Sequence, residues 1–462
     1  MIIQPRTVDV AALINGRRLS AFNYRLIVLS WLITVFDGFD MIMVGFTAPY
    51  MRDELGLSKA MLGNVFSAGL FGMMLGGFLL SYIGDRVGRR PTVVAAAVAF
   101  GILTAAVALA GSYQALVALR FFDGLALGGI LPLAWALNIE FVPSRMRSTV
   151  VTVIMVGFSL GAAVAGPMTN WIAPHHGWQG VYLAGGIGSL CCAAALWVWL
   201  PESIRFLVLK GDRPRLVSRT LHRIDPNIDV TAADHFVLSD EIKLEHNFRV
   251  GQLFHGDLRL ITPMLWFGYF ASSLAIYFAV SWGPIVVEEL NFPRHTAALV
   301  ASTGSLLGAM AGLLLMRFTD SRGPGSVAVY PAICVPVLLA LGFGLVPREG
   351  FLAMVILATL LISGGHFGVL SIAGIFYPSA IRASGAGWAT SMAKFGAILG
   401  PIAGAAVLSS GIPIIRSYAL LALFPAILCL SGIGIAAVVR GRAAAPAVDA
   451  LAVAAAGSGK RS

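Results

Sequence analysis

Apolar residues fill most of the chain in long runs, and short polar segments separate these runs. A membrane-spanning helix needs about 20 mostly apolar residues, and the stretch 260–287 holds no charged residue at all. The pattern therefore predicts an all-α integral membrane protein with twelve transmembrane helices. The predicted spans lie near residues 25–50, 61–83, 92–111, 114–139, 148–173, 179–200, 260–287, 296–316, 326–346, 351–376, 383–409 and 415–439.

Polar segments divide the predicted spans into groups. Residues 1–24 precede the first span, and the one long polar stretch, 201–258, separates six spans from six. We interpret 201–258 as a linker between two helical bundles, 25–200 and 259–440. The tail, 441–462, is rich in Ala with Gly and Ser, and is predicted to be disordered.

Composition and charge support a membrane protein and give its orientation. Hydrophobic residues make up 58% of the chain and charged residues only 12%, against about 25% charged in an average soluble domain. With the N-terminus in the cytoplasm, the inner segments hold 25 Lys and Arg residues and the outer loops five. This positive-inside distribution predicts that both termini are cytoplasmic. We expect a multi-pass protein of the cell membrane, specifically a bacterial inner membrane. The net charge of +10 then belongs to the loops and does not indicate a nucleic-acid partner.

An internal repeat organises the chain. Residues 141–147 (FVPSRMR) recur as residues 376–382 (FYPSAIR) at an offset of 235, and Asp85 meets Asp320 at the same offset. Equivalent motifs on one membrane side require an even number of crossings between them, which six satisfies. The repeat predicts two parallel six-helix halves. This is the architecture of major facilitator transporters, which hold substrate between the halves.

The predicted loop after the second span reads Gly-Asp-Arg-Val-Gly-Arg-Arg over residues 84–90 and resembles the signature loop of that superfamily. Its glycines permit a tight turn, and Asp85 can accept hydrogen bonds from donors at neighbouring helix ends. We expect a latch that controls gating; a basic loop that only sets topology is the alternative. Glu140 is predicted to be a partner for the arginines. The candidate gating residues are Gly84, Asp85, Arg86, Gly88, Arg89, Arg90, Glu140, Arg147, Asp320 and Arg382.

Two carboxyl groups lie inside the first predicted span. Asp37 follows Arg25 by twelve residues, which is roughly 18 Å along a helix and near the midplane. Asp40 follows three residues later on the same helix face. Two carboxylates so close cannot easily both ionise, and one should titrate near neutral pH. We expect this pair to carry protons; an interhelical ion pair with Arg120 or Lys394 is the alternative.

Four further residues within spans are candidates for substrate binding: Arg120, Lys394, His366 and Trp388. Arg120 could instead pair with Asp123 one turn away, and the histidine and tryptophan could simply pack between helices. Lys394 follows Arg382 by twelve residues, about 18 Å into its helix. We expect its ammonium to alternate between an aspartate of the first span and a substrate carboxylate, unless it only snorkels to water.

Several segments together resemble the aromatic acid:proton symporter family. They are the Asp-Gly-Phe-Asp of 37–40, the loop 84–90, the segment 377–389, and Pro-Glu-Ser-Ile-Arg at 201–205. The resemblance implies a proton-coupled secondary transporter that imports benzoate-like or hydroxybenzoate-like carboxylates by alternating access. It also implies functional importance for Asp37, Asp40, Asp85, Arg120, Glu140 and Arg382. Members commonly have arginine where this chain has Lys394, which bears on the exact substrate.

Other functions have less support in the sequence. Gly157, Gly161 and the pair Gly166-Pro167 are similar to a pattern of exporters in the superfamily, so a proton-coupled exporter of drugs or metabolites is the second hypothesis. A membrane sensor or enzyme is a remote third, because no nucleophile motif or metal-ligand spacing occurs. We expect no cofactor and no metal, with the proton gradient as energy source. The expected partners are a small aromatic carboxylate, protons and the lipid bilayer, and the expected state is a monomer.

Overall fold

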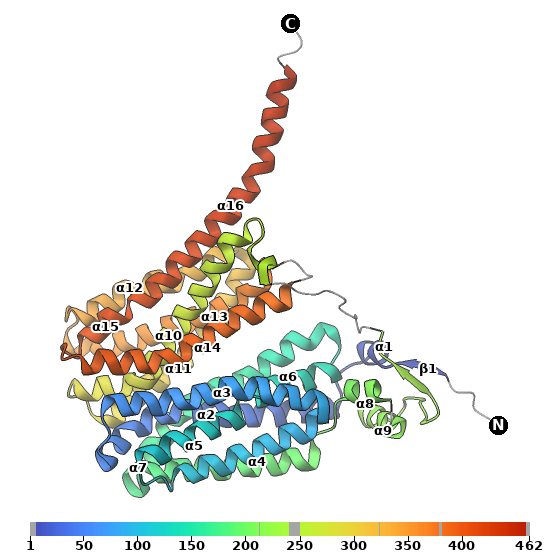
Figure 1. Ribbon diagram of the computed structural model, residues 1–462, viewed down its shortest axis with the longest axis horizontal. Helices are drawn as coiled ribbons and strands as arrows, with labels where there is room; N and C mark the ends of the chain where they lie inside the picture. Colours follow the sequence, from blue (N-terminus) through green and yellow to red (C-terminus); the bar gives the residue numbers. More distant parts are fainter. Residues whose placement is uncertain (1–5, 212, 240–249, 323, 378–380, 459–462) are drawn as a thin grey trace. The chain divides into compact units, whose positions relative to one another are not determined.

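The computed structural model describes residues 6–211, 213–239, 250–322, 324–377 and 381–458, and helices make up most of them (Figure 1). Contacts divide the chain into two compact units, Met1–Glu245 with Pro293–Ser302, and His246–Phe292 with Thr303–Ser462. The elements up to the division are β1 (Thr7–Asp9), α1 (Val10–Asn15), α2 (Ala21–Leu55), α3 (Lys59–Val87), α4 (Arg89–Val107), α5 (Tyr113–Leu127), α6 (Ile130–Phe141), η1 (Ser144–Met146), α7 (Arg147–Trp199), α8 (Ile204–Lys210), α9 (Pro214–Ile224) and β2 (His235–Val237).

The remaining elements begin with a short 3₁₀ turn and continue as helices. They are η2 (Val250–Phe254), α10 (Leu258–Glu289), α11 (Arg294–Arg322), η3 (Pro324–Ala328), α12 (Val329–Gly342), α13 (Arg348–Phe376), α14 (Arg382–Ser409), α15 (Arg416–Leu421) and α16 (Leu423–Ser458). Within their unit, α10 packs against α14, α16 and α13.

Helix α7 is longer than one membrane crossing. Its 53 residues correspond to about 80 Å of helix, more than twice the roughly 30 Å hydrocarbon core of a bilayer. The backbone leaves helical geometry at Gly177, where φ is 66°, a value that glycine adopts without steric cost. Eleven helices among the described residues are long and apolar enough to span a membrane. Counting α7 as two crossings accounts for the difference from the predicted twelve.

Glycines bring α2 and α7 into backbone contact. A Cβ atom at Gly38 would overlap the carbonyl oxygen of Phe158, and one at Gly161 would overlap that of Val35. Small residues allow helices to approach this closely when both lie in lipid. The glycine between the two aspartates of the first span therefore has a structural role, because it holds that stretch of α2 against α7.

Short elements gather at one end of the helices of the first unit, where β1, α1, α8 and α9 lie together (Figure 1). Strand β1 pairs in parallel with β2, with Val8 opposite Phe236. Asp234 stabilises the pair, because its carboxylate accepts hydrogen bonds from the backbone N–H groups of Thr231 (2.7 Å) and Arg6 (3.3 Å). These bonds and the Arg6 charge hold the pKa of Asp234 below its ordinary value, so their contribution to stability is present at neutral pH and is lost only in acid.

The predicted linker and the predicted tail both contain regular structure. The predicted linker, 201–258, contains α8, α9 and β2, because residues such as Val217, Leu221 and Ile224 bury one face of α9. The tail 441–462, predicted to be disordered, is helical as far as Ser458. Its many alanines favour helix, and they outweigh the Gly and Ser at its end.

The contact between α2 and α7 generates a first prediction. Gly38→Ala should lower the thermal midpoint of the purified protein, because the added methyl group meets backbone and overpacking costs about 1–3 kcal/mol. Gly283→Ala in α10 is the matched control, since a Cβ there meets nothing within 4 Å and alanine favours helix. Equal midpoints for the two variants would show that α2 and α7 are not in tight contact.

Candidate functional site

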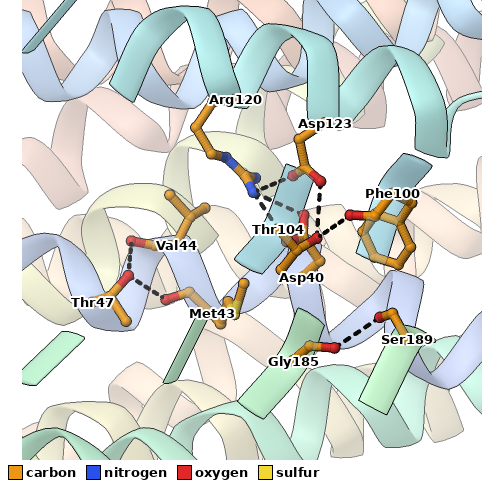
Figure 2. A network of polar contacts seen from close by, with 10 residues as sticks. All are labelled: Asp40, Met43, Val44, Thr47, Phe100, Thr104, Arg120, Asp123, Gly185 and Ser189. Atoms are coloured by element: carbon orange, nitrogen blue, oxygen red, sulfur yellow. Dashed lines mark hydrogen bonds and ion pairs between the residues drawn. The ribbon is translucent and has the colours of Figure 1, made fainter. Parts of the chain in front are cut away.

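A cluster of charged side chains is buried in the first unit, with its members on α2 and α5 (Figure 2). Asp37 and Asp123 are each 0% exposed, Asp40 is 1% exposed and Arg120 is 4% exposed. The Nη1 group of Arg120 lies 3.0 and 2.9 Å from the two carboxyl oxygens of Asp40 and 2.8 Å from Oδ2 of Asp123. One guanidinium nitrogen thus contacts two carboxyl groups.

Two hydroxyl-bearing residues border this cluster from other helices. The Thr104 hydroxyl on α4 lies 2.9 Å from Oδ1 of Asp123 and also 2.9 Å from the carbonyl oxygen of Phe100 (Figure 2). Tyr182, on α7 and fully buried, lies near Arg120, Asp40 and Asp123. The cluster is therefore enclosed by α2, α4, α5 and α7.

Asp37 differs from the other two aspartates in its surroundings. Both of its carboxyl oxygens are buried, and neither has a hydrogen-bond partner among the described residues. Its charged neighbour is Asp40, one turn along α2. An ionised carboxylate with no partner in an apolar interior is very costly, so this environment favours the protonated acid.

The charges of the cluster do not balance when every group is ionised. The cluster holds three carboxyl groups and one guanidinium, which would leave two net negative charges inside a helical bundle. The sequence left open whether Arg120 pairs with Asp123, with an aspartate of the first span or with substrate. In the structure it pairs with both Asp123 and Asp40. Its Nε atom is buried without a hydrogen-bond partner among the described residues and keeps one donor available.

A second polar cluster lies where α3, α4, α6 and α8 end or begin. Arg89 forms an ion pair with Glu140, and the hydroxyl of Ser203 donates a hydrogen bond to Glu140 at 2.6 Å. Glu140 is 4% exposed. The prediction that Glu140 partners the arginines of the loop is confirmed for Arg89.

Glu202 caps the start of α4, a role that the sequence did not reveal. Its carboxylate accepts hydrogen bonds from the backbone N–H groups of Arg89 at 2.9 Å and Arg90 at 3.1 Å. Gly88 at the turn has φ 123°, and a Cβ there would meet this same carboxylate. A negative charge at a helix N-terminus satisfies unpaired N–H groups and interacts favourably with the helix dipole. The Pro-Glu-Ser segment at 201–203 was the available signal.

Asp85 contacts one arginine of the loop from an exposed position. Its side chain is 71% exposed and lies 4.0 Å from the Arg89 guanidinium. Arg86 stacks over the Tyr82 ring at 4.3 Å, and a Cβ at Gly84 would meet Leu133 of α6. Arg147 begins α7. The gating role of these residues stays a prediction.

The other candidate residues belong to the second unit. His366 on α13 is 9% exposed, with Nδ1 3.2 Å from the Ser272 hydroxyl. Trp388 on α14 stacks on Trp266 of α10 with ring centroids 5.6 Å apart. Lys394, on the same helix, is partly buried. A site shared between these residues and the aspartates of α2 stays a prediction.

Of the two gating residues predicted in the second half, the structure describes the side chain of Arg382 only. Arg382 begins α14, and its Nε donates a hydrogen bond to the carbonyl oxygen of Tyr377 at 3.3 Å. The Asp320 side chain lies outside the described residues.

Many apolar spans together with a buried, unbalanced charge cluster define a membrane transporter, since charged groups within spans mark ion or substrate pathways. The family model of the Major Facilitator Superfamily matches residues 30–401, and the chain belongs to this superfamily. It is therefore a multi-pass secondary transporter and not an enzyme, as predicted.

Individual proteins that are similar to this chain are also transporters. The gallate transporter of Pseudomonas putida is 33% identical, with 90% of this chain and 92% of that protein covered. The 4-hydroxybenzoate transporter PcaK of the same species is 32% identical, with 88% and 91% covered. The crystal structure of a D-xylose-proton symporter matches with a TM-score of 0.71 at 17% identity and covers 90% of this chain and 97% of that one. The fold of this chain is thus that of the superfamily.

The cap on α4 generates a second prediction. Glu202→Gln should destabilise the purified protein by about 1–2 kcal/mol, because it removes charge-assisted hydrogen bonds to the helix N-terminus. Asp85→Asn is the matched comparison and should shift the thermal midpoint much less, given its exposure. If Asp85→Asn destabilised the protein as much as Glu202→Gln does, the hydrogen bonds of Glu202 would not account for the stability of this end of α4.

Proposed function

We propose that this protein is a proton-coupled symporter that imports an aromatic carboxylate by alternating access. The observation that carries the proposal is Asp37, whose two carboxyl oxygens are buried without a hydrogen-bond partner in the described part of the chain. A carboxyl group in this position is stable when protonated and unstable when ionised. It can release its proton only after its surroundings change, which is the property a coupling residue needs.

Similarity to known transporters supports the substrate class. The relatives named above transport gallate and 4-hydroxybenzoate, both of which are aromatic carboxylates. Arg120 offers this chain a cation suited to such a group, because a planar guanidinium binds carboxylates well. Its partner Asp40 would have to yield a hydrogen bond for the substrate to enter, which would connect binding to the protonation of the cluster.

The charge of the loops supports the orientation of the protein. Lys and Arg gather in the segments assigned to the inner side, which favours cytoplasmic termini in a bacterial inner membrane. We propose that a single chain is the functional unit.

The glycines that suggested an exporter have packing contacts. Gly157 and Gly161 lie against the backbone of Trp31 and Val35 on α2. Helix contact is sufficient to explain these two glycines, and export stays the second hypothesis.

The proposal predicts the behaviour of Asp37→Asn. Proteoliposomes with wild-type protein should accumulate labelled 4-hydroxybenzoate or gallate when the outside is more acidic than the inside, and a protonophore should abolish accumulation. Asp37→Asn keeps the shape of the side chain but cannot exchange the proton, so uphill accumulation should be lost while binding of the acid persists. Asp257→Asn, outside the cluster at the start of α10, is the control.

Two results would contradict this function. Wild-type protein that accumulates no member of a panel of aromatic acids under a pH gradient would exclude the proposed coupling. Asp37→Asn protein that accumulates the acid as well as the parent would remove this residue from the mechanism.

A further inference from the structure

We propose that Asp123 is a second proton-binding residue, so that the buried cluster carries two protons, one on Asp37 and one on Asp123. The inference rests on the proposed function, since it concerns how many protons accompany each substrate. It arises from the hydrogen bonds around Asp123 and from the charge that the cluster must balance.

The Thr104 hydroxyl provides the first reason. This hydroxyl has one hydrogen, yet its oxygen lies 2.9 Å from the Phe100 carbonyl oxygen and 2.9 Å from Oδ1 of Asp123. A carbonyl oxygen can only accept. When Asp123 is protonated, its O–H donates to Thr104 and the Thr104 hydroxyl donates to Phe100, so both contacts are hydrogen bonds. When Asp123 is ionised, one of the two contacts brings acceptors together with no proton between them.

The Arg120 guanidinium provides the second reason. Its Nη1 group carries two hydrogens, and they suffice for Asp40 on one side and Oδ2 of Asp123 on the other. Asp40 contacts this nitrogen through both carboxyl oxygens, whereas Asp123 uses only one. The geometry fits an ion pair between Arg120 and an ionised Asp40, with Asp123 accepting one further hydrogen bond as a neutral acid.

Charge balance provides the third reason. Within the described part of the chain, Arg120 is the one cation that pairs with these aspartates. With Asp40 ionised and both other aspartates protonated, the net charge of the cluster is zero. Any other total of protons leaves a net charge in a low-dielectric interior, where it is costly.

The groups that face Asp123 come from each helix packed around it. Those that titrate or carry charge are Asp40 on α2, Arg120 on α5 and Tyr182 on α7, and α4 contributes the uncharged Thr104. Asp37 faces Asp40 along α2. Because Asp40 holds both of its oxygens against the guanidinium, the second proton is best placed on Oδ1 of Asp123, next to the Thr104 hydroxyl.

The number of protons determines the electrical character of transport. A monovalent carboxylate that moves with two protons carries one net positive charge inward, whereas the same anion with one proton moves no net charge. An inside-negative voltage without a pH gradient should thus drive uptake by the wild-type protein. Removal of the Asp123 proton site should abolish this voltage response while leaving uptake driven by a pH gradient.

The test uses proteoliposomes with a potassium diffusion potential and labelled 4-hydroxybenzoate or gallate as probe. We expect voltage-driven accumulation by wild-type protein and its loss in Asp123→Asn, with accumulation under a pH gradient retained. Asp123→Thr is a second neutral variant in case the first does not fold. Ser189→Ala is the matched control, since this buried hydroxyl near the cluster donates to the Gly185 carbonyl oxygen and its removal should leave both responses unchanged.

Infrared difference spectra provide a readout that does not depend on transport. Purified wild-type protein should show carbonyl stretching bands of two buried carboxylic acids; Asp37→Asn should remove one and Asp123→Asn the other. The inference would be overturned if uptake by wild-type protein did not depend on voltage. It would also be overturned if Asp123→Asn protein kept the voltage response or kept both infrared bands. Failure of wild-type uptake under a pH gradient as well would instead count against the proposed function.

Discussion

One guanidinium within an apolar helical bundle constrains everything around it. Arg120 is 4% exposed and arginine stays charged in proteins, so the fold must supply negative charge to it and must limit that charge to what one cation can balance. Asp40 and Asp123 meet the first requirement by contacting the same nitrogen. In the proposed function protonation meets the second, and it would couple the electrical state of the bundle to the pH on the side that has access.

The helix contacts around this cation keep its partners in place. Gly38 lies between Asp37 and Asp40 in sequence and brings α2 against the backbone of Phe158. Gly69, on α3, lies beside the Arg120 side chain, and Gly124 lies against the backbone of Gly69. Backbone contacts of this kind contain no side chain that could change rotamer. These contacts therefore fix the backbone positions of α2, α3 and α5 around the cluster.

Sequence alone predicted the features that depend on local pattern. Hydropathy was sufficient for the spans, and the rarity of charge inside them identified Asp37, Asp40 and Arg120. The sequence could not identify both partners of Arg120. Asp123 is one turn away on the same helix, but Asp40 is 80 positions distant, and local pattern gives no information on such a contact. The capping role of Glu202 was not predicted for the same reason, because its hydrogen bond to Arg89 joins residues 113 positions apart. The two contacts of the Thr104 hydroxyl depend on distances that no spacing encodes.

The parallel pair of β1 and β2 has a consequence for biosynthesis. Its strands are separated in the chain by all the helices from α1 to α9. Because a ribosome makes the N-terminal residues first, β1 exists without its partner until the chain has grown past Val237. The pair can close only after α2 to α7 have been synthesised. It therefore joins Thr7–Asp9 to helices α2 to α7 that have already been synthesised, and it forms late in the assembly of these helices.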